Sequence, residues 1–100
     1  MANVHRQLDG ENVWVEFKDK GYPYSLQRRI REERDDEKTL EIIAPYIVAC
    51  RLPKADGSVL ETISVATDLF EVEEDVVVKV IREFFVFRQE RMYNPVAPNS

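Results

Sequence analysis

A stretch dense in valine and phenylalanine lies near the C-terminal end of the chain: EEDVVVKVIREFFVFRQER, residues 73–91. As a strand it would have no cleanly apolar face, and it is long for a strand. As a helix, with roughly 100° between successive residues, it gathers most of its apolar side chains on one side. These are Val76, Val77, Val80, Ile81, Phe84 and Phe87. Because acids begin the stretch and arginines end it, as the helix dipole favours, we predict a long C-terminal amphipathic helix.

The apolar arc of this helix is wider than the stripe that a surface helix normally buries. Val78 and Phe85 extend it to about half of the circumference, and Val86 stands among the polar residues. One interpretation is a central helix, covered by a sheet on one side and by a second helix on the other. The other is that Val78, Phe85 and Val86 form an exposed patch that a protein partner covers. The two interpretations are compatible.

The first third of the chain predicts one strand and one charged helix. Residues 1–11 are polar, and we expect them to form a flexible lead-in. NVWVEFK, residues 12–18, alternates in the manner of a strand, and the following DKGYPY breaks that pattern. Ser25 is placed to cap a helix that runs to about Asp36, with a narrow apolar stripe and many charges.

Proline and glycine punctuate the middle of the chain. Residues 39–44 suit a short helix, which Pro45 would end. Tyr46–Leu52 is rich in β-branched residues and reads as a strand, with the end of a helix as the alternative. The Asp56-Gly57 pair then predicts the turn of a β-hairpin.

The hairpin leads into the C-terminal helix. We expect VLETISV, residues 59–65, to be the return strand, and Thr67 or Asp68 to cap a short helical turn. Residues 92–100 contain two prolines and little to bury, so they are expected to be a mobile tail. The predicted fold is therefore α+β, in one small domain over residues 12–91.

Net charge and cysteine usage narrow the class of partner and the compartment. The net charge of −5 and the isoelectric point near 4.9 disfavour nucleic acid as a partner, because the long-range field repels phosphates. A single cysteine allows no internal disulfide, which suits a reducing cytoplasm. We see no signal peptide and no apolar run long enough for a bilayer, so we expect a cytoplasmic protein without a membrane partner.

The charge is unevenly distributed, and two opposite patches are candidates for protein contact. One is positive and contains Arg28, Arg29, Arg31 and Arg34, against the acids Glu32 and Glu33. The other is acidic and contains Glu71, Glu73 and Glu74, with no basic residue between positions 68 and 75. The patches would complement each other between copies of the chain. The plainer interpretation is that they are solvated, or that they pair within one molecule.

Few residues carry reactive chemistry. His5 is the single histidine, and Cys50 with His5 would be the candidate nucleophile and base. A buried structural role for Cys50 is the better interpretation, because it lies in an apolar stretch. We find no metal-ligand spacing and no glycine-rich phosphate loop. We therefore expect no catalytic residue, no metal and no cofactor.

The stretch IVACRLPKADGSVLETISVATDLFEVEEDVVVKVIREFF, residues 47–85, resembles the second half of small tail-assembly chaperones and related minor structural proteins of long-tailed bacteriophages. The shared pattern is a strand, a turn with Asp-Gly, a few extended residues, an acidic helix start and a closing amphipathic helix. The matching positions are Leu52, Asp56, Gly57, Val77, Ile81 and Phe84. The chain departs from the pattern at Cys50, where a tryptophan often stands.

The resemblance implies a non-enzymatic binding protein that coats an extended partner during assembly and can self-associate. If encoded by a phage, it would act in the host cytoplasm. The main alternative is an acidic inhibitor that mimics nucleic acid, of the anti-restriction or anti-CRISPR type, although nine interspersed arginines interrupt any negative face. A small RNA-binding domain that uses Arg28 with Tyr22 and Tyr24 is the weakest alternative, given the net charge.

Overall fold

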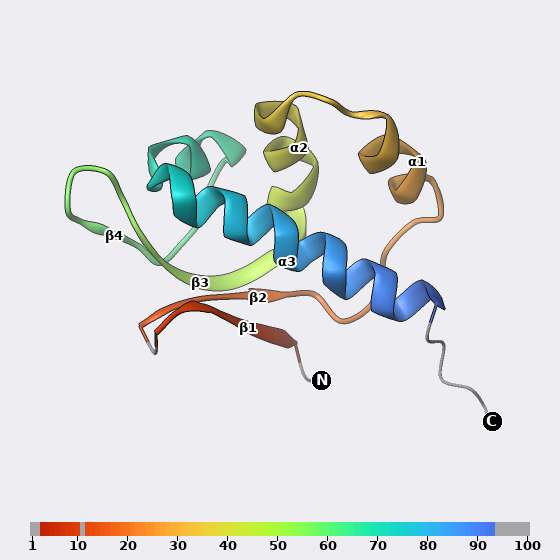
Figure 1. Cartoon of the computed structure of the whole chain (residues 1–100), viewed down its shortest axis with the longest axis horizontal. Helices are drawn as coiled ribbons and strands as arrows, with labels where there is room; N and C mark the ends of the chain where they lie inside the picture. Colours follow the sequence, from red (N-terminus) through yellow and green to blue (C-terminus); the bar gives the residue numbers. More distant parts are fainter. Residues whose placement is uncertain (1–2, 11, 94–100) are drawn as a thin grey trace.

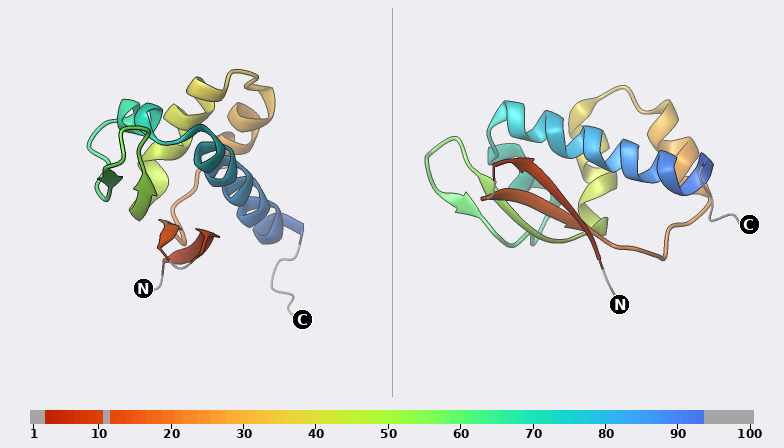
Figure 2. Two further views of the ribbon diagram at one scale, coloured as in Figure 1. Left: turned by 60° about the vertical axis from the view of Figure 1, so that its left-hand side comes forward. Right: turned by 60° about the horizontal axis from the view of Figure 1, so that its bottom comes forward.

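The computed structural model describes residues 3–10 and 12–93, which form an α+β fold with one four-stranded antiparallel sheet. The strands follow the order β1-β2-β3-β4 across the sheet. They are β1 (Val4–Asp9), β2 (Val13–Phe17), β3 (Ile47–Pro53) and β4 (Val59–Leu60). The helices are α1 (Ser25–Glu32), α2 (Asp36–Ile43) and α3 (Glu74–Tyr93), with 3-10 turns η1 (Ala44–Tyr46) and η2 (Ala66–Glu71). The α-helices lie on one side of the sheet, with α3 running across it (Figures 1 and 2).

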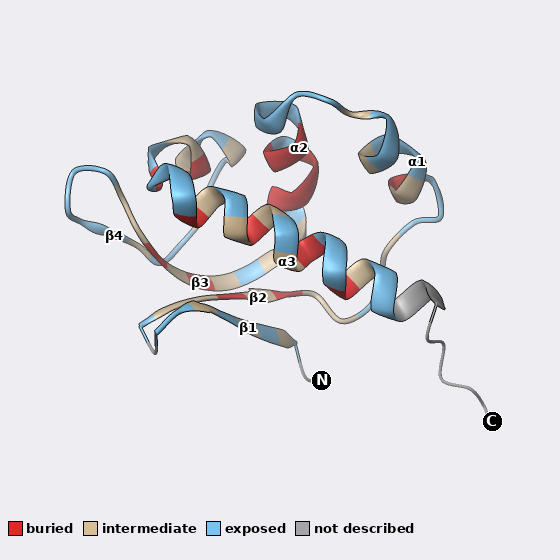
Figure 3. Cartoon of the chain, viewed as in Figure 1, coloured by how far each residue is buried: buried red, intermediate tan, exposed pale blue. Residues whose placement is uncertain are grey.

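The core forms between α3 and the inner face of the sheet. Val76, Val80, Phe84 and Phe87, spaced by three or four residues along α3, are all buried, and red patches recur along this helix in Figure 3. They meet Phe17 of β2, whose ring centroid lies 5.2 Å from that of Phe84 and 6.0 Å from that of Phe87. The predicted amphipathic helix is therefore confirmed, and one of its faces is a core face.

The expected lead-in over residues 1–11 is wrong for its central part, because Val4–Asp9 is an edge strand paired with β2. Two interactions hold this polar segment in place. Backbone pairing to β2 satisfies one edge, and the guanidinium of Arg6 reaches α3, with Nη2 2.8 Å from Oε1 of Glu90 and Nη1 3.9 Å from Oε1 of Glu83. The domain therefore begins before residue 12.

The charged helix predicted from Ser25 to about Asp36 ends earlier, at Glu32, and the short helix predicted over residues 39–44 is confirmed as α2 but begins earlier, at Asp36. Glu33 adopts an extended conformation at the end of α1, and the side chain of Asp35 then accepts a hydrogen bond from the Glu37 backbone N–H at 2.8 Å. This cap starts α2 in a new direction. Ser25 does not cap α1, because it is the first residue of the helix. The N-cap position is occupied by Tyr24, whose side chain makes no capping hydrogen bond.

The middle of the chain follows the prediction, with a shorter return strand. Ile47–Pro53 is a strand, so the helical alternative for Tyr46–Leu52 is wrong. Gly57, with φ of 93°, makes the hairpin turn, but only Val59–Leu60 of the expected residues 59–65 pairs with β3.

Asp68 does act as a cap, from inside η2: its carboxylate accepts hydrogen bonds from the backbone N–H groups of Ser64 and Val65. These bonds lower the pKa of Asp68. At the C-terminal end, α3 continues through Tyr93, and residues 94–100 of the expected tail lie outside the described residues.

Candidate functional site

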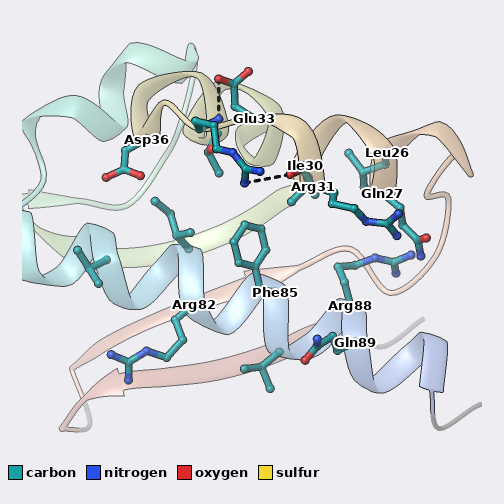
Figure 4. Close-up of a pocket in the computed structure, with 15 residues that line it drawn as sticks. Leu26, Gln27, Ile30, Arg31, Glu33, Asp36, Arg82, Phe85, Arg88 and Gln89 are labelled. Carbon is teal, nitrogen blue, oxygen red and sulfur yellow. Dashed lines mark hydrogen bonds between the residues drawn. The ribbon is translucent and has the colours of Figure 1, made fainter.

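A second apolar stripe runs along α3 beside its core face. Val78, Ile81 and Phe85 recur at helical spacing on the side turned toward α1 and α2. The groove between these helices has a volume of about 640 Å³. Figure 4 shows Phe85 pointing from α3 into this groove, toward Ile30 and Arg31 of α1. A groove of this size accommodates a row of side chains, since ligand sites typically measure roughly 300–1,000 Å³.

The three apolar residues predicted to form an exposed patch do line this groove. Val78 is 48% exposed, Phe85 37% and Val86 36%. Phe84, next to Phe85 in the sequence, is fully buried. One side of α3 therefore belongs to the core, and the adjacent side leaves apolar surface in contact with solvent.

The opposite wall comes from the short helices α1 and α2. In α1, Leu26 is buried and Ile30 is half-buried, and both line the groove. Thr39 and Asp36 of α2 complete this wall. Leu26 is the buried residue of α1, so this helix is attached to the rest of the fold by a small contact. A wall held by so few buried groups can shift when a ligand enters the groove.

The groove carries more positive than negative charge, in contrast to the whole chain. Its lining includes four arginines (Arg31, Arg34, Arg82 and Arg88) and two acids (Glu33 and Asp36). Arg88 stacks over the ring of Tyr22, with its guanidinium carbon 4.0 Å from the ring centroid. Among the residues that the structure describes, Arg31, Arg34 and Arg82 form no ion pair. Within the described residues, therefore, arginines on both walls have no carboxylate at ion-pair distance.

The structure separates the arginines that were predicted as one patch, since Arg31 and Arg34 line the groove and the other two do not. Arg31 lines the groove with Val78, Phe85 and Val86. Arg28 and Arg29 are exposed but do not line it. Arg29 instead borders a second hollow, of about 540 Å³, whose lining is mainly charged.

The predicted acidic patch lies elsewhere, where η2 leads into α3. Glu71, Glu73, Glu74 and Asp75 are all exposed, and we call them the acidic corner. None of the ion pairs among the described residues includes a member of this corner. The interpretation that the two charge patches neutralise each other within one molecule is therefore wrong for the described part of the chain.

Several groove residues were not predicted from the sequence, although helical spacing on α3 would have indicated some of them. Arg82 and Gln89 follow Val78 and Phe85 by four residues each, so they share the same face of α3. The residues of the facing wall had no such signal, because it is the fold that brings α1 next to α3.

Cys50 and His5, the candidate nucleophile and base, lie on opposite faces of the sheet. Cys50 is buried opposite Val15, its thiol donates to the carbonyl oxygen of Leu60 at 3.6 Å, and burial and the Glu61 charge raise its pKa to about 11. His5 pairs with Glu16, the next residue along β2, and therefore lies on the other face of the sheet. Across residues 3–10 and 12–93 no three metal-ligating side chains cluster, and no helix is both long enough and apolar enough to cross a bilayer.

Comparison with protein-family models, with curated proteins and with solved structures gave no match to this chain.

Proposed function

We propose that this is a non-enzymatic binding and assembly protein, and that it holds an apolar segment of another protein chain in the groove between α1, α2 and α3. One observation carries the proposal: Val78, Phe85 and Val86 are exposed and line one groove, whereas the apolar residues on the neighbouring face of α3 (Val76, Val80, Phe84 and Phe87) are buried in the core. Exposed apolar residues gathered in a concave site mark interaction surfaces.

The shape of the groove favours a helical segment as the ligand. Val78 and Phe85 are seven residues apart, which is about 10 Å along a helix axis. A partner helix lying beside α3 would place its own apolar residues, at positions i, i+3 or i+4 and i+7, against this stripe. The resemblance to tail-assembly chaperones agrees with this class of function, since those proteins bind other chains during assembly.

The direct test is binding of a labelled helical peptide, followed by fluorescence anisotropy. The peptide has leucine at positions i, i+4, i+7 and i+11 and glutamate on its flanks, and a second peptide has lysine in place of glutamate. We expect saturable binding of the glutamate peptide. Phe85→Asp should weaken it by roughly 10-fold, because the ligand would lose burial of the exposed third of this side chain and would face a carboxylate instead.

Val48→Asp is the matched control, because Val48 is also exposed, at 45%, but lies on β3 outside the groove. It should bind as the wild type does. Equal binding by Phe85→Asp and wild type would refute the groove as the contact surface. A protein that binds neither peptide, and does not gain mass with concentration, would refute the proposed function itself.

A further inference from the structure

We infer that the occupant of the groove is a second copy of this chain, whose acidic corner (Glu71, Glu73, Glu74 and Asp75) docks against the arginines of the groove. This inference rests on the proposed function and names its partner. The first support is the charge left unpaired on both surfaces. Arg31, Arg34 and Arg82 have no ion pair among the described residues, and neither does any member of the acidic corner.

A contact between two identical grooves is disfavoured by its charge. In such an arrangement the arginines of one molecule would face the arginines of the other, and like charges in direct contact are repulsive. The occupant must bring acidic groups to both walls, because Arg31 and Arg34 lie on the α1 side and Arg82 on α3. The acidic corner meets this requirement.

The acidic corner cannot turn into the groove of its own molecule. Glu74 and Phe85 belong to the same helix and are about 16 Å apart along its axis, at 1.5 Å per residue. The corner lies at the start of α3, and the α1 wall lies beside the later turns of that helix (Figure 1). The corner ends about one turn before Val78, the first groove residue of α3, so the rigid helix holds it away from Arg31 and from the later groove residues, and no ion pair joins the two surfaces among the described residues. A second molecule can bring the two surfaces into contact.

The acidic end of the molecule also offers apolar surface. Val65, immediately before η2, is 57% exposed, and Phe70 within η2 is half-buried. These side chains can contact the apolar floor of the groove while the carboxylates meet the arginines. A contact of this kind combines apolar burial with charge-assisted hydrogen bonds.

Such a contact is heterologous, because two different surfaces of the same chain meet. The docked molecule keeps its own groove free, and the molecule that receives it keeps its acidic corner free. Assembly therefore continues head to tail, into a ring or an open spiral depending on the rotation between neighbours. The molecule is elongated, 47 by 30 by 21 Å, and the corner lies at the start of α3 while the groove runs beside its later turns, which is compatible with a head-to-tail series of copies.

Sedimentation velocity on the full-length protein, with a groove variant and a corner variant, tests this arrangement. The groove variant is Arg31→Glu with Arg82→Glu, and the corner variant is Glu73→Gln with Glu74→Gln. We expect wild-type mass to increase with concentration and to fall as salt is raised. Each variant alone should remain a monomer, because each lacks one of the two surfaces.

The decisive sample is the mixture of the two variants. The intact corner of the groove variant can still enter the intact groove of the corner variant, so the mixture should form a 1:1 dimer and grow no further. Arg28→Glu on the outer side of α1 and Glu37→Gln with Glu41→Gln on α2 are matched controls, because these charges are exposed outside the groove and the corner. They should assemble as the wild type does.

Several results would overturn the inference. An increase of mass with concentration in either variant alone would show that copies associate through a different contact. A mixture of the two variants that stays monomeric would show that the groove and the acidic corner do not bind each other. A wild type that remains monomeric at all concentrations would exclude self-association. If that monomer still binds the glutamate peptide in the groove, only the identity of the partner is wrong; if it binds no peptide, the proposed function fails as well.

Discussion

Phe84 and Phe85 are neighbours in the sequence with opposite surroundings, and truncating each to alanine should have very different costs. Phe84 is fully buried, and its ring centroid lies 5.2 Å from that of Phe17 and 6.1 Å from that of Tyr22. Phe85 is 37% exposed and opens onto the groove. The pair therefore separates the core face of α3 from the face that we propose as a contact surface.

The expected magnitudes follow from these surroundings. Truncation of a buried phenylalanine to alanine typically costs about 3–5 kcal/mol, because transfer free energy is lost and a cavity is left. At Phe84 the loss includes edge-to-face packing on Phe17, and such aromatic pairs contribute about 0.5–1.5 kcal/mol each. At Phe85 one side of the ring already meets solvent, so we expect a cost of about 1 kcal/mol. Because the free energy of unfolding of a domain is only about 5–15 kcal/mol, Phe84→Ala should remove a large part of the stability.

Equilibrium urea unfolding, followed by far-ultraviolet circular dichroism at low protein concentration, measures this difference. With a slope of roughly 1–3 kcal/mol per molar urea, the midpoint of Phe84→Ala should fall by about 2 M and that of Phe85→Ala by less than about 1 M. Phe84→Leu and Phe85→Leu give a milder pair if the alanine variant at position 84 does not fold. Equal losses at the two positions, or a larger loss at Phe85, would refute the assignment of the two faces of α3.

Three further predictions follow from local contacts. Asp35→Ala should lower the free energy of unfolding by about 1 kcal/mol through loss of the α2 cap, whereas Ser25→Ala should have little effect because Ser25 caps nothing; urea midpoints of the two variants check this. Burial raises the pKa of Cys50 from 9.0 to about 11, so its contribution to stability is complete below pH 9 and is lost as the pH rises through about 11. Because a pKa difference of one corresponds to about 1.4 kcal/mol, the loss should reach up to about 3 kcal/mol, and it should appear as a difference in alkaline unfolding between wild type and Cys50→Ala. Arg6→Ala should cost up to about 1 kcal/mol and increase amide hydrogen exchange in β1, because it removes the ion pairs to Glu83 and Glu90; unchanged exchange would show that strand pairing alone holds β1.

The long C-terminal helix illustrates what local sequence information can reach. Its apolar residues recur with the period of a helix, and its acids and arginines stand at the ends that the dipole favours, so its existence and its core face were predictable. The same periodicity showed that Val78, Phe85 and Val86 exceed what one face can bury. The β-hairpin was predictable for a similar reason, since the Asp56-Gly57 turn acts within a few residues.

The edge strand β1 was not predicted, and the boundary between α1 and α2 was placed about four residues too late. The segment that forms β1 is polar, and it is held by pairing with β2 and by Arg6, whose partners on α3 are 77 and 84 residues away in the sequence. The break after α1 depends on Asp35, which caps a helix of its own where the pattern of charges continues unchanged. Contacts between residues distant in the sequence therefore determine β1, and the capping hydrogen bond of Asp35 determines where α2 begins.

The groove itself belongs to the tertiary structure. The sequence by itself determined that α3 has more apolar surface than one core face can bury, because that property depends only on the spacing of residues along one helix. It did not determine that α1 stands opposite this surplus, or that Arg31 lines the groove while Arg28 and Arg29 lie outside it. Those relations arise when three helices pack on one sheet, since packing brings together residues that no local pattern connects.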